Sequence, residues 1–166
     1  MTLRRFLSAL ALVPLAAAVL SPAASAADHT QREVIRVYHE SVVPTSVSGS
    51  GVGEVRTFFI PMAVNGVAGD GQYLSATLTT VATNMPGNQE LRASNLAFVF
   101  GAEADQILVG GVSLYPPAGA TLAPGEKTVR PVLGGSGKYD GARGQLISRN
   151  YGPKGWTHTF LISVLR

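Results

Sequence analysis

The sequence predicts an all-β domain, built as an antiparallel barrel or sandwich, and three observations lead to this prediction. Short stretches rich in β-branched and aromatic residues recur along the chain, and most of them alternate in polarity. Turn signals separate these stretches at regular spacing, and no stretch has the periodicity of an amphipathic helix. About eight strands are expected: Glu33–Val43, Glu54–Val64, Gln72–Thr83, Leu91–Phe100, Gln106–Tyr115, Lys127–Leu133, Gly144–Asn150 and Trp156–Leu165.

The first stretch, Glu33–Val43, alternates clearly, so that its two faces can be read from the sequence. One face carries Ile35, Val37, His39 and Ser41. The segment that follows, from Pro44 to Gly53, is rich in serine and glycine and is expected to be a loop.

The next stretches are separated by short turn motifs. Asn65-Gly66 ends the second stretch and is a strong hairpin signal. Gly69-Asp70-Gly71 is expected to form another turn before the third stretch, and Pro86-Gly87-Asn88 a turn after it. Later breaks lie at 101–105, 116–124, 134–141 and 152–155, and the last three are rich in glycine or proline.

The N-terminus has the pattern of an export signal. Arg4 and Arg5 precede a largely apolar stretch that ends at Leu20, and Ala24-Ser25-Ala26 has the small residues of a cleavage site. We therefore expect residues 1–26 to be a signal peptide and residues 27–166 to form one domain. Localisation is expected to be secreted, with no membrane span after cleavage; the alternative is an uncleaved anchor.

Charge and cysteine content exclude several classes of protein. Removing Arg4 and Arg5 with the signal leaves 11 Lys and Arg against 10 Asp and Glu, a net charge of +1. The remaining cations form no cluster, which argues against nucleic-acid binding. The sequence has 0 cysteines, so disulfides and thiol chemistry are excluded. No cofactor and no metal site are expected, since the three histidines and the carboxylates form no ligand motif.

The stretch GGSGKYDGARG, residues 134–144, resembles a glycine-rich turn shared by the allene oxide cyclase and dirigent families. Its context is similar in order, from Val37-Tyr38-His39-Glu40 to the aromatic final strand at Trp156–Phe160. The resemblance implies an eight-stranded antiparallel barrel and a homo-oligomer, with a trimer as in the plant members. Five glycines of this turn are expected to be structural. Gly134, Gly135 and Gly137 are expected to supply positive φ, and Gly141 and Gly144 to permit close backbone approach.

Two departures argue against allene oxide cyclase activity itself. The pocket glutamate of that family directly follows the first-strand tyrosine, whereas His39 follows Tyr38 here and Glu40 is expected to point outward. The family's pocket cysteine is absent. The resemblance instead leaves open an isomerase-type cyclisation of another molecule by confinement, which needs few diagnostic residues.

Candidate site residues follow from the strand faces and from closure of the barrel. The polar residues expected to line a ligand pocket are Ser41, Tyr73, Ser75, Thr77 and Thr79. In a closed barrel the first and last strands are neighbours, so His39 and His158 are expected to lie close together. Either they form a catalytic acid–base or ligand-orienting pair, or one is a core histidine and the other lies at a subunit contact. Three arginines, Arg56, Arg92 and Arg143, are expected to make surface or interface hydrogen bonds.

The function that fits these observations is a secreted barrel accommodating a small apolar molecule, either to steer its cyclisation or stereoselective coupling or only to bind it. The alternative is a non-catalytic extracellular binding, structural or self-assembly protein with a filled barrel. A filled barrel requires large inward side chains on every strand.

Overall fold

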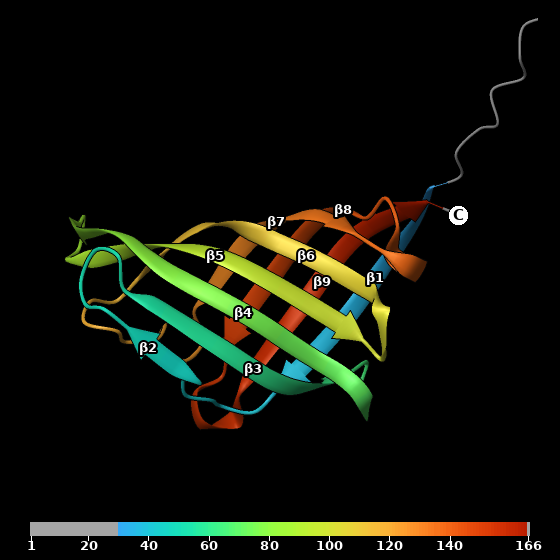
Figure 1. Cartoon of the computed structure of the whole chain (residues 1–166), viewed down its shortest axis with the longest axis horizontal. Coiled ribbons are helices and arrows are strands. Elements are labelled where there is room, and N and C mark those ends of the chain that lie inside the picture. The colour runs from blue at the N-terminus through green and yellow to red at the C-terminus, as the bar shows by residue number, and fades with distance from the viewer. Residues whose placement is uncertain (1–29, 166) are drawn as a thin grey trace, which may run out of the picture.

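The computed structural model describes residues 30–165, which form one closed antiparallel barrel (Figure 1). The predicted signal peptide, residues 1–26, lies outside the described residues. The strands are β1 (Thr30–His39), β2 (Ser46–Ser48), β3 (Val55–Val64), β4 (Val67–Met85), β5 (Gln89–Phe100), β6 (Ala102–Tyr115), β7 (Lys127–Gly135), β8 (Arg143–Asn150) and β9 (Trp156–Leu165). Two short 3₁₀ turns, η1 (Gly137–Tyr139) and η2 (Gly152–Lys154), follow β7 and β8.

The sheet follows the chain order and closes through its first strand. Its order is β1-β9-β8-β7-β6-β5-β4-β3-β2, and β1 also pairs with β3 through Val37↔Val64 and Tyr38↔Ala63. The eight long strands therefore form the wall, while the three-residue β2 adds only to β3. Figure 1 shows β3 to β6 in front, with β7 to β9 and β1 crossing behind them. Closure gives every long strand a neighbour on each side, although β1 and β3 pair over only two residues each. No helix among residues 30–165 is long and apolar enough to cross a membrane.

The hairpin between β3 and β4 forms at the predicted Asn65-Gly66. Both residues have positive φ, 51° and 85°, and Val64 pairs directly with Val67. The turn predicted at Gly69-Asp70-Gly71 is wrong, because these residues lie inside β4, which begins at Val67. Gly71 still has a positive φ of 71°, and its Cβ position lies against the carbonyl of Gly101. The positive φ of Gly71 is thus a local distortion within β4 and does not reverse the chain.

Aromatic and aliphatic side chains fill one end of the barrel. Phe98 and Phe160 are fully buried and meet edge to face, with ring centroids 4.9 Å apart. Phe100 packs on Tyr139 of η1 with a centroid distance of 4.6 Å. Burying each such ring contributes about 1.5–3 kcal/mol, so this end holds the main stabilising core. The other end is lined differently and remains hollow.

The glycine-rich segment 134–144 joins β7 to β8, but its glycines have two different roles. Gly137 has the expected positive φ of 60°, and Gly141 and Gly144 also have positive φ, at 68° and 141°. The close backbone approach expected at Gly144 is confirmed, because a Cβ there would collide with the carbonyl of Leu161. The expectation of positive φ at Gly134 and Gly135 is wrong, because both continue β7 as strand residues. Gly135 still needs to be glycine, since a Cβ there would collide with the backbone of Tyr139 and Gln106.

Candidate functional site

The hollow end of the barrel holds a cavity of about 320 Å³. It lies where β1, β4, β6 and β8 end and where β3, β5, β7 and β9 begin. Its wall residues are inward-facing side chains of these strands, together with residues of the loops after β1 and β6: His39, Val42, Val43, Pro44, Arg56, Phe58, Ile60, Leu74, Ala76, Leu78, Arg92, Leu96, Tyr115, Gly119, Thr121, Arg130, Ser148, Trp156 and His158.

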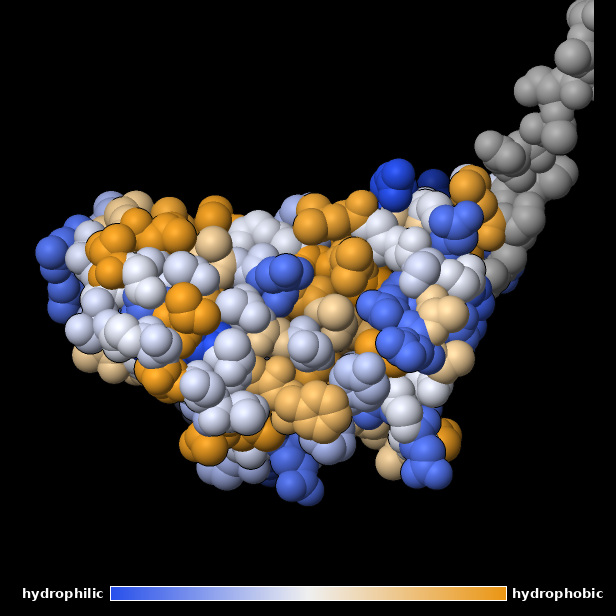
Figure 2. All heavy atoms as spheres, in the orientation of Figure 1, coloured by the Kyte–Doolittle hydropathy of each residue, from blue (hydrophilic) through white to orange (hydrophobic). Residues whose placement is uncertain are grey.

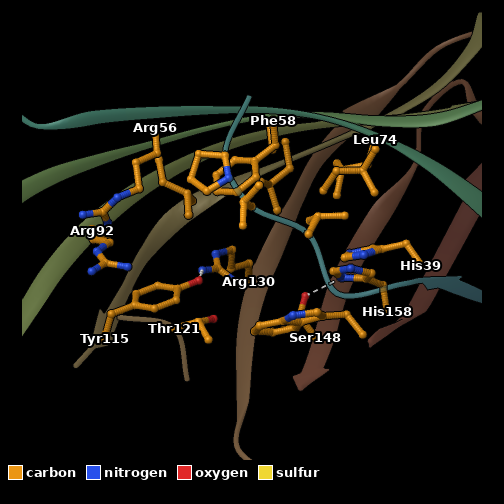
Figure 3. A pocket seen from close by; sticks show the side chains of 18 of the residues that line it. His39, Arg56, Phe58, Leu74, Arg92, Tyr115, Thr121, Arg130, Ser148 and His158 are labelled. Atoms are coloured by element: carbon orange, nitrogen blue, oxygen red, sulfur yellow. Dashed lines mark hydrogen bonds between the residues drawn. The ribbon is translucent and has the colours of Figure 1, made fainter. Parts of the chain in front are cut away.

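An apolar wall forms one part of this cavity. Phe58, Leu74 and Leu96 come from three neighbouring strands, and Leu74 and Leu96 are buried. Ala76 lies beside them, and its small side chain leaves space that a larger residue would occupy. Figure 3 shows Phe58 and Leu74 on the same side of the cavity. This wall suits the hydrophobic body of a small molecule.

A histidine pair forms a second part of the wall, as closure of the barrel predicts. Val37 of β1 pairs with His158 of β9, and the rings of His39 and His158 stack with centroids 5.0 Å apart. Both histidines are buried. His158 Nδ1 is 2.8 Å from the Ser148 hydroxyl, while its buried Nε2 has no hydrogen-bond partner among the described residues. Figure 3 shows the Ser148–His158 contact beside His39.

The hydrogen bond at His39 defines which ring nitrogen carries the proton. Nδ1 lies 2.6 Å from the carbonyl oxygen of Glu40, and a carbonyl can only accept. Nδ1 is therefore the donor, and in the neutral ring Nε2 is left as an acceptor or base. Glu40 itself is exposed, in line with the expectation that its side chain points outward.

Burial keeps both imidazoles uncharged at neutral pH. It lowers the pKa of His39 below the ordinary value, and the hydrogen bond to the Glu40 carbonyl only partly opposes this effect. Burial lowers the pKa of His158 further, with the charges of His39 and Arg130 acting in the same direction. A neutral imidazole donates one hydrogen bond through its N–H and accepts one at its other nitrogen, which can act as a base toward a bound molecule.

Three buried arginines form the third part of the wall. Arg56, Arg92 and Arg130 are only 6%, 2% and 3% exposed. Each lies on the inward face of its strand, on the same face as hydrophobic residues further along it. Figure 3 shows Arg56, Arg92 and Tyr115 on one side of the cavity and the histidines on the other. Burial of this much positive charge requires partners.

Arg92 donates four hydrogen bonds within the protein. Its Nη2 and Nε donate to Glu90 Oε2 at 2.8 and 3.2 Å, and its Nη groups also donate to the carbonyls of Pro116 and Ala120. The second oxygen of Glu90 accepts the backbone N–H of Ala118. Burial alone would raise the pKa of Glu90, but the hydrogen bonds from Arg92 and Ala118, with the charges of Arg92 and Arg56, lower it. This pair therefore ties the loop after β6 to the barrel end.

Arg56 and Arg130 are satisfied less completely. Arg56 forms an ion pair with Glu54, but its buried Nη1 has no hydrogen-bond partner among the described residues. Arg130 donates only to neutral hydroxyl groups, which belong to Ser94, Thr128 and Tyr115. The Arg130–Tyr115 bond of 2.8 Å is drawn in Figure 3.

The structure places the other predicted pocket residues away from the cavity. On β4, Leu74, Ala76 and Leu78 face inward, so the prediction for the alternate residues Tyr73, Ser75, Thr77 and Thr79 is wrong by one position of register. Leu74, Ala76 and Leu78 face inward because the barrel is stabilised by burying the apolar side chains of its strands. Tyr73 instead packs on Phe59, with centroids 5.0 Å apart.

The prediction for Ser41 is also wrong. Ser41 lies beyond the end of β1, is exposed, and donates to the carbonyl of Gly152 at 2.9 Å. The strand alternation on which its placement depended ends with β1 at His39.

Arg56, Arg92 and Arg143 were expected to make surface or interface hydrogen bonds. For Arg56 and Arg92 this is wrong, because both are buried at the cavity, whereas Arg143 is exposed. Arg130 was not considered as a site residue. The sequence holds a signal that identifies all three. In Arg56-x-Phe58-x-Ile60, Arg92-x-Ser94-x-Leu96 and Arg130-x-Val132 an arginine shares the face of inward hydrophobic residues. If these hydrophobic residues point into the barrel, an arginine on the same face of the strand must point into the barrel as well.

Comparison with known proteins identifies the fold. No protein-family model matches the chain, and no curated protein matches its sequence significantly. Among solved structures, a pyocyanin demethylase matches with a TM-score of 0.54 and 16% identity, covering 80% of this chain and 99% of that one. The pterocarpan synthase dirigent protein matches with a TM-score of 0.55 and 10% identity, covering 89% of this chain and 95% of that one. The chain therefore has the antiparallel barrel fold of dirigent-like proteins, as the motif at 134–144 predicts.

Proposed function

We propose that the barrel binds one small, largely apolar molecule in its hollow end. The observation that carries this proposal is the cavity of about 320 Å³ with its apolar wall. Two buried polar atoms of its lining residues, Arg56 Nη1 and His158 Nε2, have no hydrogen-bond partner among residues 30–165. The volume of the cavity falls at the lower end of the range of small-molecule sites, and such sites place a few polar groups in a hydrophobic lining. The hollow end also argues against the alternative of a completely filled barrel.

Bound in this way, the molecule is held in one orientation between the apolar wall and the histidine pair. Nε2 of His39 is then positioned to accept a proton from it, and the buried Nε2 of His158 to form a hydrogen bond with it. Orientation together with exclusion of water is sufficient to steer cyclisation or coupling of a reactive molecule. The names of the two structural neighbours, a demethylase and a synthase, support a role for this fold in small-molecule reactions.

We further propose that the mature chain, residues 27–166, acts outside the cell. The basic start, the apolar stretch and the Ala24-Ser25-Ala26 site at the N-terminus support this proposal. N-terminal sequencing of the protein recovered from the culture medium tests it. A start at Ala27 is expected, whereas recovery of the uncleaved chain from the cell membrane would contradict it.

A pair of substitutions on neighbouring residues tests ligand binding. Ala76→Phe places a ring in the cavity, while Ser75→Phe places the same ring on the exposed outer face of β4. Wild type and both variants are incubated with an extract of the producing culture and examined by native mass spectrometry. We expect wild type and Ser75→Phe to retain a small molecule that Ala76→Phe has lost. Equal retention by all three, or retention by none, would contradict the proposal.

The outer wall supports self-association as a second property. Large hydrophobic side chains are exposed there, among them Phe59 (61%), Leu108 (42%) and Leu133 (60%). Figure 2 shows hydrophobic residues interspersed with hydrophilic ones across the visible face. We propose a homo-oligomer, with the trimer implied by the family resemblance as the expected state. Analytical ultracentrifugation tests this, and a monomer at micromolar concentration would contradict it.

A further inference from the structure

The charges around the cavity do not balance. Three buried guanidinium groups, Arg56, Arg92 and Arg130, face two carboxylates, Glu54 and Glu90. Arg56 pairs with Glu54 and Arg92 with Glu90. Within residues 30–165, Arg130 has no carboxylate within the 4.0 Å of an ion pair.

The hydroxyl partners of Arg130 orient its guanidinium without neutralising it. Ser94 accepts from Nε at 3.0 Å, Thr128 accepts from Nη1 and Tyr115 accepts from Nη2 at 2.8 Å. A guanidinium has five N–H donors, so one N–H on Nη1 and one on Nη2 remain without an acceptor among the described residues. Two donors on neighbouring nitrogens are what a carboxylate needs for a bidentate contact.

An unpaired cation in this position is costly for the folded protein. Arg130 is 3% exposed, and a buried charge without a counter-ion is destabilising by several kcal/mol, which is why buried charges are nearly always paired. An anion entering the cavity would remove this cost and gain charge-assisted hydrogen bonds. The site is thus prepared for negative charge at a point where residues 30–165 supply none.

Arg56 adds an independent observation in the wall of the same cavity. Its guanidinium is buried and lines the cavity, and Nη1 has no hydrogen-bond partner in the described part of the chain. Gly119 lies against this guanidinium, and a Cβ at that position would displace it. The loop after β6 therefore leaves room for Arg56 and does not cover it with a side chain.

We propose that the ligand is a compact organic anion, a carboxylate or a comparable delocalised oxyanion on an apolar body, and that Arg130 binds its charged group. This inference rests on the proposed binding function and specifies its ligand class. The anionic group lies against Arg130 and the free Nη1 of Arg56. The apolar body extends toward Phe58, Leu74 and Leu96. The charged group thereby determines which part of the molecule faces His39 and His158.

Two nearly isosteric probes test this assignment. Adamantane-1-carboxylate and adamantane-1-carboxamide are rigid and similar in shape, and they differ in charge at pH 7.5. Isothermal titration calorimetry measures the affinity of both for wild type, Arg130→Gln, Arg130→Lys and the control Arg149→Gln. Arg149 is a suitable control because it is an exposed arginine on β8.

We expect wild type and Arg149→Gln to bind the carboxylate at least tenfold more tightly than the amide. Arg130→Gln should lose this preference while its affinity for the amide stays within about twofold, and Arg130→Lys should retain part of it. Equal affinities of wild type for the two probes would overturn the inference, and this result does not depend on whether the variants fold. It would not contradict the proposed binding function. Binding of neither probe at millimolar concentration would also overturn it, whereas the proposed function depends on the separate comparison of Ala76→Phe with Ser75→Phe.

Discussion

Acidification from pH 7.5 to 5.0 should destabilise the folded barrel through its buried histidines. Burial, with the charges of His39 and Arg130, holds the pKa of His158 well below its ordinary value. The unfolded chain therefore binds a proton at this residue in a pH range where the folded chain does not. The stability that the neutral ring contributes is complete above the unfolded pKa, near 6.5, and is lost as the pH falls below it.

The size of the effect follows from this difference in protonation. At pH 5.0 the unfolded chain carries a proton on this histidine and the folded chain does not. This difference makes the free energy of unfolding about 2 kcal/mol smaller at pH 5.0 than at pH 7.5. The lowered pKa of His39 acts with the same sign. Glu90 and Asp105 also have lowered pKa values, but carboxylates lose their contribution only below their unfolded pKa, near 4. They lie outside this pH window.

Urea unfolding of the mature chain at pH 7.5, 6.5 and 5.0 measures the effect, with His158→Gln as the comparison. Wild type should lose at least about 2 kcal/mol across the window, and the variant should lose about 2 kcal/mol less than wild type. The comparison uses the change with pH, so a constant cost of the substitution does not affect it. A wild-type stability that is flat from pH 7.5 to 5.0, or an undiminished loss in His158→Gln, would refute the reasoning.

Two further predictions concern the turn glycines and the buried ion pair. Gly144→Ala should lower the free energy of unfolding by at least about 2 kcal/mol, because φ is 141° and the new Cβ collides with the carbonyl of Leu161. Gly134→Ala should change it by less than about 0.5 kcal/mol, since that site has ordinary strand geometry and free space, and an equal effect in urea unfolding would count against this account. Glu90→Gln should cost about 3 kcal/mol and expose the loop after β6 to protease, because it leaves Arg92 buried without its counter-ion. Glu126→Gln, at an exposed carboxylate on the same loop, is the control, and equal protease resistance of the two variants would contradict the prediction.

Much of the fold could be predicted from the sequence because its signals are local. Asn65-Gly66 fixes a hairpin by its own backbone preferences, and the eight long strands contain or overlap the eight predicted stretches. The short β2, Ser46–Ser48, was missed within the predicted loop at 44–53, because three residues carry no periodicity. Its pairing with β3 depends on tertiary contact alone.

The candidate site could be predicted only in part. Proximity of His39 and His158 follows from barrel closure, which joins the first and last strands whatever their side chains. The face of β4 was assigned incorrectly because polar residues were expected in the pocket, although Leu74, Ala76 and Leu78 provide the burial that closes the wall. The buried arginines depend on partners far away in sequence, such as Tyr115 for Arg130, and these pairings appear only once the strands are in register.

Trp156 provides the most direct test of the central claim that an organic anion with an apolar body binds in the hollow end. It is the only tryptophan in the sequence, and it lines the cavity beside His158. Adamantane-1-carboxylate does not absorb where tryptophan is excited, so a titration followed by fluorescence reports the environment of this one ring. The account predicts a saturable change in wild type and Ser75→Phe that is absent in Ala76→Phe. No change in wild type, or the same change in Ala76→Phe, would contradict it.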